Sequence, residues 1–248
     1  MEAVHLAREQ GRLSVCQLSL IDNTPQSSDK HLLFDGVVAA LETENIAVSL
    51  RAGQGNIGFG RAHNMAIRAS KCDLHLVLNP DCVLSPMALC KALYSMHTHP
   101  ECALLAAQGV NAEGDETPMA FRYPKIGILL CRFLNLHRFF PNMMRAYEYR
   151  GEIKQLMPVV RSSGAFMLMQ TQTLQAIGAF DEHFFLHFED IDLSLRIGRY
   201  GKILCDPEVR VTHYGGRASG GGGHTLALVK SAFIFYNLYG WFKYKERK

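Results

Sequence analysis

Acidic side chains occur at two places in the sequence where they could bind a metal ion or move a proton. Asp81 ends the segment Asn79-Pro-Asp81, directly after the apolar residues 74–78. A carboxylate fixed at the end of a buried strand suits a hard divalent cation, which in turn holds a diphosphate. The alternative is an aspartate that only caps the next element, and the local sequence leaves both interpretations open.

The second acidic site is a cluster of three carboxylates, Glu189, Asp190 and Asp192, after the aromatic run 184–188. On a helix that begins near residue 189, Glu189 and Asp192 share a face and Asp190 points elsewhere. Repulsion among acids beside aromatic side chains raises the pKa of one of them, which suits a general base. Alternatively, one acid caps the helix and pairs with Arg196, and the apolar alternation over 191–197 also fits a strand.

A single histidine, His213, follows the short apolar segment 209–212 and precedes Tyr214 and a pair of glycines. A neutral imidazole in this place could complete a metal site. A purely structural histidine is the alternative interpretation.

The glycine-rich segment 53–60 contains Gly53-Gln-Gly-Asn-Ile-Gly58, which matches G-x-G-x-x-G. Because it lies between a predicted strand and a predicted helix, a dinucleotide-binding oxidoreductase that uses NAD or FAD is one possible class of protein. More generally, the glycines allow the backbone to pass close to a ligand, and the following helix offers N–H groups to an anion.

The elements that must position these residues alternate along the first half of the chain. Apolar runs predict strands over 13–21, 46–50 and 74–78, and helical periodicity predicts helices over 1–10, 31–42, 61–70 and 86–97. This order predicts βαβ units and a mostly parallel sheet. Since ligands bind beyond the carboxyl ends of such strands, the loops that begin at Asp22, Gly53 and Asn79 are expected to meet at one site.

Composition excludes several classes of protein. The 248 residues are 48% hydrophobic and 20% charged, so the chain can bury a core. A net charge of +3 is too small to argue for nucleic acid. The seven cysteines form no C-x-x-C pair, and the charged start and the lack of a long uncharged apolar run predict neither a signal peptide nor a membrane span. We therefore expect a cytoplasmic protein.

Two segments, 123–150 and 226–248, combine aromatic and basic residues. Within them, 126–133 and 226–242 have the apolar spacing of helices. They are either ordinary helices that face the core or surfaces that contact a membrane, where apolar side chains enter the interface and Lys and Arg meet anionic headgroups.

Taken in order, the motifs resemble family 2 glycosyltransferases of the GT-A fold, nearest to the bacterial rhamnosyltransferase-like group. The matching segments over residues 13–216 are Leu20-Ile-Asp-Asn23, Gly55-Asn-Ile-Gly-Phe-Gly-Arg-Ala-His-Asn64, Leu76-Val-Leu-Asn-Pro-Asp81, Ser163-Gly-Ala165, Ile177-Gly-Ala-Phe-Asp181, Phe184-Phe-Leu-His-Phe-Glu-Asp-Ile-Asp-Leu193 and His213-Tyr-Gly-Gly216. The resemblance implies an α/β, Rossmann-like nucleotide-diphospho-sugar transferase with a mixed, mostly parallel sheet flanked by helices. It divides the chain into a domain over 1–216, with a nucleotide-binding part over 1–108 and an acceptor part over 109–216, and an amphipathic, basic helical tail over 217–248.

The resemblance also implies an activity. The expected enzyme is an inverting glycosyltransferase that moves a sugar, rhamnose or another deoxyhexose, from a dTDP- or UDP-sugar donor. Its acceptor would be a saccharide or a polyprenol-linked molecule of cell-surface polysaccharide biosynthesis, reached at the cytoplasmic face of the inner membrane. The cofactor would be Mg²⁺ or Mn²⁺. By the same resemblance Asp190 is the base beside Glu189, Asp81 and His213 bind the metal, and the donor-binding residues are Asp22, Asn23, Gly58, Arg61, Asn64 and Asn79.

The sequence departs from the family pattern in two ways. Family members normally open with an apolar strand that ends in a Thr-Tyr-Asn-like motif, whereas residues 1–10 here correspond to the helix that follows it. We therefore expect a sheet edge without that strand, which favours pairing into a homo-oligomer. Asn79 replaces the first acid of the D-x-D motif, so metal binding should be weaker than with two carboxylates. A non-catalytic relative that scaffolds a partner enzyme is the alternative function.

Overall fold

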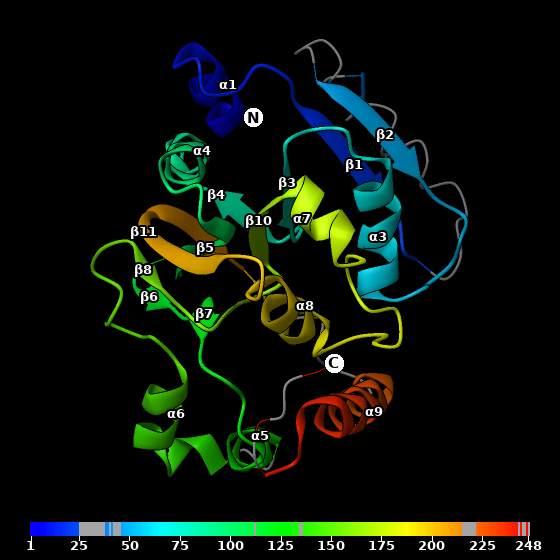
Figure 1. Cartoon of the computed structure of the whole chain (residues 1–248), viewed down its shortest axis with the longest axis vertical. Helices are drawn as coiled ribbons and strands as arrows, with labels where there is room; N and C mark the ends of the chain where they lie inside the picture. The colour runs from blue at the N-terminus through cyan, green and yellow to red at the C-terminus, as the bar shows by residue number, and fades with distance from the viewer. Residues whose placement is uncertain are drawn as a thin grey trace.

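The computed structural model describes residues 1–24, 38–39, 41, 46–111, 113–133, 136–214, 222–242, 244 and 247. Its largest sheet runs through the middle of the molecule (Figure 1). The strands lie in the order β3 (Leu74–Leu78), β10 (Phe166–Gln170), β5 (Cys102–Val110), β11 (Lys202–His213) and β4 (Cys82–Leu84). β6 (Glu116–Thr117) extends β5, and β8 (Met157–Pro158) pairs with β11. β5 and β11 pair in parallel, and the other pairs of this sheet are antiparallel.

The predicted strands of the first half do not all join this sheet. β1 (Gln17–Ile21) and β2 (Ala47–Arg51) form a parallel pair of their own, and α3 (Phe59–Ala69) follows them. Among the described strands, β3 pairs only with β10. The strand predicted from residue 13 begins at Gln17, and the helix predicted over 31–42 falls almost entirely outside the described residues.

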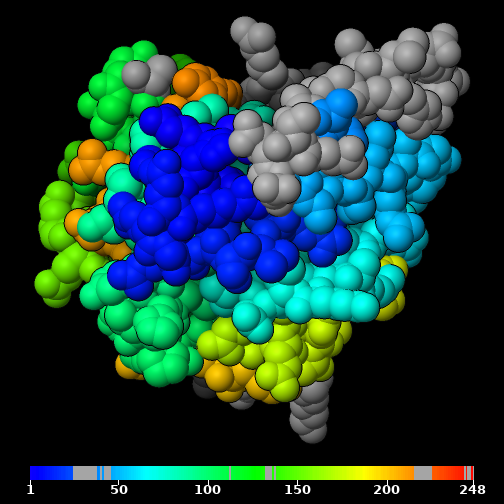
Figure 2. All heavy atoms as spheres, turned by 90° about the horizontal axis from the view of Figure 1, so that it is seen from above, coloured from blue at the N-terminus to red at the C-terminus, as the bar shows by residue number. Residues whose placement is uncertain are grey.

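Helices cover the sheet on both sides. α1 (Glu2–Glu9) packs on α4 (Ala88–Thr98) through Ala3, Ala7 and Leu89. From above, the N-terminal residues, drawn in dark blue, form one block beside β2 and α3 (Figure 2). α7 (Thr171–Ala176) and α8 (Glu189–Ile197) pack near α3 and the sheet. The alternating segment 191–197 is therefore helical, which buries Ile191, Leu193 and Ile197 together.

The second half adds a group of helices at the end of the molecule opposite α1 and α4 (Figure 1). They are α5 (Ile126–Phe133), the short 3₁₀ helix η1 (Leu136–Arg138), α6 (Pro141–Tyr147) and α9 (Gly222–Tyr239). A two-stranded ladder, β7 (Ala120–Phe121) with β9 (Arg161–Ser162), connects this group to the main sheet. None of the helices within the described residues is both long and apolar enough to cross a membrane.

The C-terminal helix α9 carries apolar residues on its exposed face as well as on its buried face. Thr225, Lys230 and Asn237 are exposed beside them. Phe235, Tyr236 and Tyr239 are buried against α8, while Val229 and Phe233 are more than half exposed on the other face.

Candidate active site

Asp81 and His213, predicted as metal ligands, lie together at the end of the sheet. The antiparallel register of β4 and β11 sets His213 opposite Cys82, and the Tyr214 N–H donates to the Asp81 carbonyl at 2.9 Å. As a result His213 Nε2 lies 3.3 Å from Asp81 Oδ1. Ligand atoms of Asp81, Cys82 and His213 all lie within 4.8 Å of one another.

The chemistry of this group fits a hard or borderline divalent cation. Asp81 is 44% exposed and His213 is 31% exposed, so an incoming oxygen ligand can reach both. The Cys82 thiol donates to the Ala165 carbonyl, and burial followed by the nearby Asp81 charge raises its pKa to about 11. Among the three residues, the Asp81 carboxylate oxygen and the His213 imidazole nitrogen are the donors suited to a hard or borderline cation. Such a set suits Mg²⁺ or Mn²⁺ whose other ligands are diphosphate oxygens and water.

The turn Ser163-Gly-Ala165, at the start of β10, links this group to Asp190. The Ala165 carbonyl accepts the Asn79 N–H at 3.0 Å, while the Gly164 N–H donates to Asp190 Oδ2 at 3.1 Å. A methyl group at Gly164 would lie 3.3 Å from Asp190 Cβ. The absence of a side chain at Gly164 thus allows Asp190 to approach the backbone that holds Asn79.

Asp190 sits at the first turn of α8 with both carboxylate oxygens engaged. Oδ1 accepts the Ile191 N–H at 2.8 Å, and Oδ2 lies 3.6 Å from the Arg161 guanidinium. Arg161 is buried, donates to the Tyr147 hydroxyl and packs over the Phe121 ring at 4.2 Å. The buried cation of Arg161 thus lies beside the partly exposed carboxylate of Asp190. The sequence analysis did not identify Arg161.

Glu189, the neighbour of Asp190, has a different environment. The residue is 6% exposed, and Oε2 has no hydrogen-bond partner in the described structure. Burial first, and then the charge of Asp190, raises the pKa of Glu189 to about 8. Glu189 is therefore protonated at neutral pH. As predicted, Glu189 and Asp192 share the buried face of the helix and Asp190 points away from it.

The backbone before this helix is held in an unusual conformation. His187 and Phe188 have φ angles of +68° and +69°, which non-glycine residues rarely adopt. Phe188 is buried against Phe235 of α9, at a ring distance of 5.1 Å. Packing of the aromatic run against α9 thus maintains the sharp turn that presents Glu189 and Asp190.

The glycine loop packs against the same aromatic run. Gly58 has a φ of +92°, and a Cβ there would lie 2.6 Å from the Phe185 carbonyl, which accepts the Phe59 N–H at 3.0 Å. The sequence predicted that N–H groups at the start of this helix are open to an anion. The first N–H of α3 instead donates to a carbonyl of the protein. The Asn23 side chain accepts the Ile57 N–H and donates to the Gly58 carbonyl, so this predicted donor-binding residue organises the loop. Asp22 stands beside it and accepts the Thr24 N–H.

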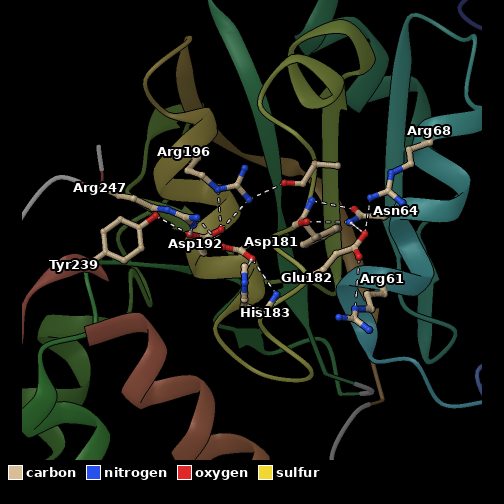
Figure 3. Close-up of polar contacts among 12 residues, drawn as sticks. Arg61, Asn64, Arg68, Asp181, Glu182, His183, Asp192, Arg196, Tyr239 and Arg247 are labelled. Atoms are coloured by element: carbon tan, nitrogen blue, oxygen red, sulfur yellow. Dashed lines mark hydrogen bonds and ion pairs between the residues drawn. The ribbon is translucent and has the colours of Figure 1, made fainter. Parts of the chain in front are cut away.

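Two further predicted donor residues, Asn64 and Arg61, contact the segment after β10. Asn64 is fully buried, and its amide bonds to both the N–H and the carbonyl of Phe180 at 2.9–3.0 Å (Figure 3). Asn64 also donates to Glu182, which forms ion pairs with Arg61 and Arg68. In the structure, the Asn64 side chain fastens α3 to residues 180–182.

A second set of charges fastens the same segment from the other side (Figure 3). Arg247 lies 2.8 Å from Asp181 and 2.7 Å from Asp192, and Arg196 and the Tyr239 hydroxyl also bond Asp192. Burial alone would raise the pKa of Asp181, but hydrogen bonds from His183 and Arg247 outweigh it and keep that pKa below its usual value. Arg196 therefore pairs with Asp192 and not with Asp190.

A comparison with known families identifies the class of protein that has this fold and site. Residues 24–222 match the family model described as glycosyltransferase like family 2, so the chain belongs to this family. Its fold is GT-A. The chain is 14% identical to GalNAc-T7, solved with UDP, GalNAc and Mn²⁺, with a TM-score of 0.58 over 90% of this chain and 42% of that one. A mannosyltransferase from Pyrobaculum calidifontis, solved with GDP-Man and Mn²⁺, is 16% identical, with a TM-score of 0.54 over 87% of this chain and 51% of that one.

Among curated proteins, the chain is similar to the N-acetylglucosaminyl-diphospho-decaprenol L-rhamnosyltransferase of Mycobacterium tuberculosis. The two are 28% identical over 196 residues, which cover 73% of this chain and 64% of the relative. The chain thus spans less than two thirds of that relative's length. The resemblance to family 2 glycosyltransferases that the sequence motifs indicated is confirmed.

Proposed function

We propose that this protein is an inverting glycosyltransferase that uses a nucleotide-diphosphate sugar. The observation that carries the proposal is the turn 163–165, which contacts both parts of the site. The Gly164 N–H donates to the Asp190 carboxylate. The Ala165 carbonyl accepts the N–H of Asn79, which lies two residues before Asp81. A carboxylate suited to accept a proton and a donor set suited to a divalent cation are thereby tied to the same few backbone atoms. A metal-assisted inverting transfer uses both of these groups close together.

In this mechanism Asp190 accepts the proton of an acceptor hydroxyl. The acceptor oxygen forms a bond to the anomeric carbon, while the bond from that carbon to the diphosphate oxygen breaks and its electron pair leaves with the nucleoside diphosphate. The Gly164 and Ile191 N–H groups orient the carboxylate, and Arg161 balances its charge before the proton arrives. Attack from the side opposite the diphosphate inverts the anomeric configuration.

Asp81 and His213 would hold the divalent cation, with Asn79 completing the D-x-D-like segment. When bound, Mg²⁺ or Mn²⁺ supplies charge that stabilises the leaving diphosphate. Asp22, Asn23, Gly58 and Arg61 would border the nucleotide side of the site, with the loop conformation set by Asn23.

The donor is a dTDP- or UDP-sugar in this proposal, with rhamnose or another deoxyhexose as the sugar, and the acceptor is a saccharide or a polyprenol-linked molecule. Support comes from the mycobacterial rhamnosyltransferase, whose name describes a decaprenol-linked substrate. A role in cell-surface polysaccharide assembly, which the sequence resemblance implied, is part of this proposal.

The test compares the wild-type chain with Asp190→Asn and, as a control, Asp73→Asn, which changes an exposed aspartate. Calorimetric titration with UDP and dTDP, with and without Mn²⁺, measures donor-side binding, and release of nucleoside diphosphate measures turnover. We expect Mn²⁺-dependent binding in all three proteins and a loss of turnover of about 10²–10⁴-fold in Asp190→Asn alone. Turnover that survives this change contradicts the base assignment. A folded wild-type chain that binds neither nucleotide contradicts the transferase itself and favours the scaffold function.

A further inference from the structure

Exposed apolar side chains gather at one end of the molecule. Ten of the 19 large apolar residues that are exposed within the described chain belong to α5, η1, the two residues between η1 and α6, α9 and the residues after α9. Phe139 is 76% exposed and Phe242 is 95% exposed. Exposed apolar groups concentrated in one region mark an interaction surface more often than single scattered ones do. We call this region the aromatic end.

Helix α9 exposes an apolar surface that a binding partner could bury. Its inner face packs against the aromatic run before Asp190, while Leu226, Val229 and Phe233, spaced by three and four residues, form a stripe on the outer face. Trp241 continues the stripe, with its ring 5.8 Å from that of Phe233. A surface helix normally places polar residues on its outer face. An apolar outer stripe is stabilised when another apolar phase or surface covers it.

The charges around the stripe indicate the chemistry of that cover. The sequence has no acidic residue between Glu116 and Glu148, or between Glu208 and Glu246. The exposed ionic side chains of the described parts of α5, η1, α6 and α9, and of the residue before α5, are cations: Lys125, Arg138, Arg145 and Lys230. Apolar side chains flanked by cations, without acids, complement a surface with an apolar interior and negatively charged headgroups.

We propose that the aromatic end binds the surface of an anionic lipid bilayer, with Phe139, Phe233 and Phe242 entering the interface and the cations meeting the headgroups. The same inner face of α9 packs on Phe184, Phe188 and Ile191, which flank Asp190. Binding through α9 would therefore hold the acceptor side of the candidate site next to the lipid surface. This inference depends on the exposed side chains and stands whether or not the proposed transfer reaction is correct.

The test is co-sedimentation of the whole chain with vesicles of phosphatidylcholine, alone or with about one third phosphatidylglycerol. The variant Phe139→Ser/Phe242→Ser removes two exposed rings, and Val15→Ser/Tyr94→Ser is a matched control with exposed apolar residues in the α1–α4 region. Circular dichroism checks that all proteins are folded. Analytical ultracentrifugation without vesicles measures association between copies of the chain.

We expect the anionic vesicles to bind the wild-type chain and the control at least about tenfold more tightly than neutral vesicles, with weaker binding at high salt. The Phe139→Ser/Phe242→Ser variant should bind anionic vesicles at least about tenfold more weakly. Wild-type protein that does not sediment with anionic vesicles, or a variant that binds like wild type, overturns the proposal. The proposal is also overturned if the wild-type chain is a dimer that does not bind vesicles and the variant is a monomer. The aromatic end would then bind a second copy of the chain.

Discussion

Replacement of Glu189 by glutamine tests how strongly this buried carboxyl group makes stability depend on pH. The side chain is 6% exposed, and its Oε2 has no partner in the described structure. Burial, followed by the charge of Asp190, raises its pKa from the ordinary 4.5 to about 8. Glutamine has nearly the same shape and stays neutral at every pH, so the change removes the titration and little else.

The sign and size of the effect follow from the two pKa values. In the unfolded chain Glu189 loses its proton near pH 4.5, whereas in the folded protein it keeps the proton up to about pH 8. Between these values the unfolded state binds fewer protons, so the free energy of unfolding falls as pH rises. Within this range each pH unit lowers the free energy of unfolding by about 1.4 kcal/mol, and the whole range from pH 4.5 to pH 8 lowers it by about 4–5 kcal/mol. Below pH 4.5 no penalty exists, and above pH 8 it is complete.

The assay is urea unfolding, followed by circular dichroism, at pH values from about 4.5 to 9. We expect the stability difference between Glu189→Gln and wild type to grow by about 4–5 kcal/mol over this range in favour of the variant. Other groups titrate in both proteins, so the difference isolates Glu189. The exposed Glu113→Gln is the control and should track wild type. A difference between Glu189→Gln and wild type that stays constant with pH would refute the reasoning.

Three further predictions concern the loop, the core and the metal ligands. Gly58→Ala should lower the free energy of unfolding by more than about 3 kcal/mol, because a Cβ would lie 2.6 Å from the Phe185 carbonyl. Gly53 has a similar φ and no close neighbour, so Gly53→Ala is the control and should lower it by only about 1–2 kcal/mol. Urea unfolding measures both. Asn64→Ala should cost about 2–4 kcal/mol, since it leaves a buried N–H and carbonyl unpaired, and equal stability with wild type would contradict its anchoring role. Asp81→Asn should raise the Mn²⁺ concentration needed for nucleotide binding by at least about tenfold, and calorimetry that shows no change would exclude Asp81 as a ligand.

Sequence motifs pointed to residues that the fold brings together. Asp81 and His213 stand 132 positions apart; local sequence left each with a structural alternative, and the family resemblance implied that both bind a metal. The structure brings them to 3.3 Å. The spacing of Glu189 and Asp192 likewise predicted which acid would point away from the buried face, because helical periodicity depends only on neighbours in the chain.

Sequence reasoning missed the residues that hold the site together. Arg161 gave no local signal, because its partners are Asp190, 29 positions away, and two aromatic rings. The same is true of Arg247, which bonds Asp192 across 55 positions. The anchoring contacts of Asn64 were missed for the same reason, since its partners lie more than 110 positions further along the chain.

What the sequence by itself determined is therefore the family, the positions of most strands and helices, and the chemical types of residue available to bind a cation or accept a proton. Only the tertiary structure decided which of three adjacent acids is neutral, which is paired and which is partly exposed. Composition and periodicity act over a few residues, whereas desolvation and charge pairing depend on every element packed around a group. At Glu189 and Asp190 those elements come from β9, β10 and α9, and their packing buries one carboxyl group and leaves its neighbour partly exposed beside Arg161.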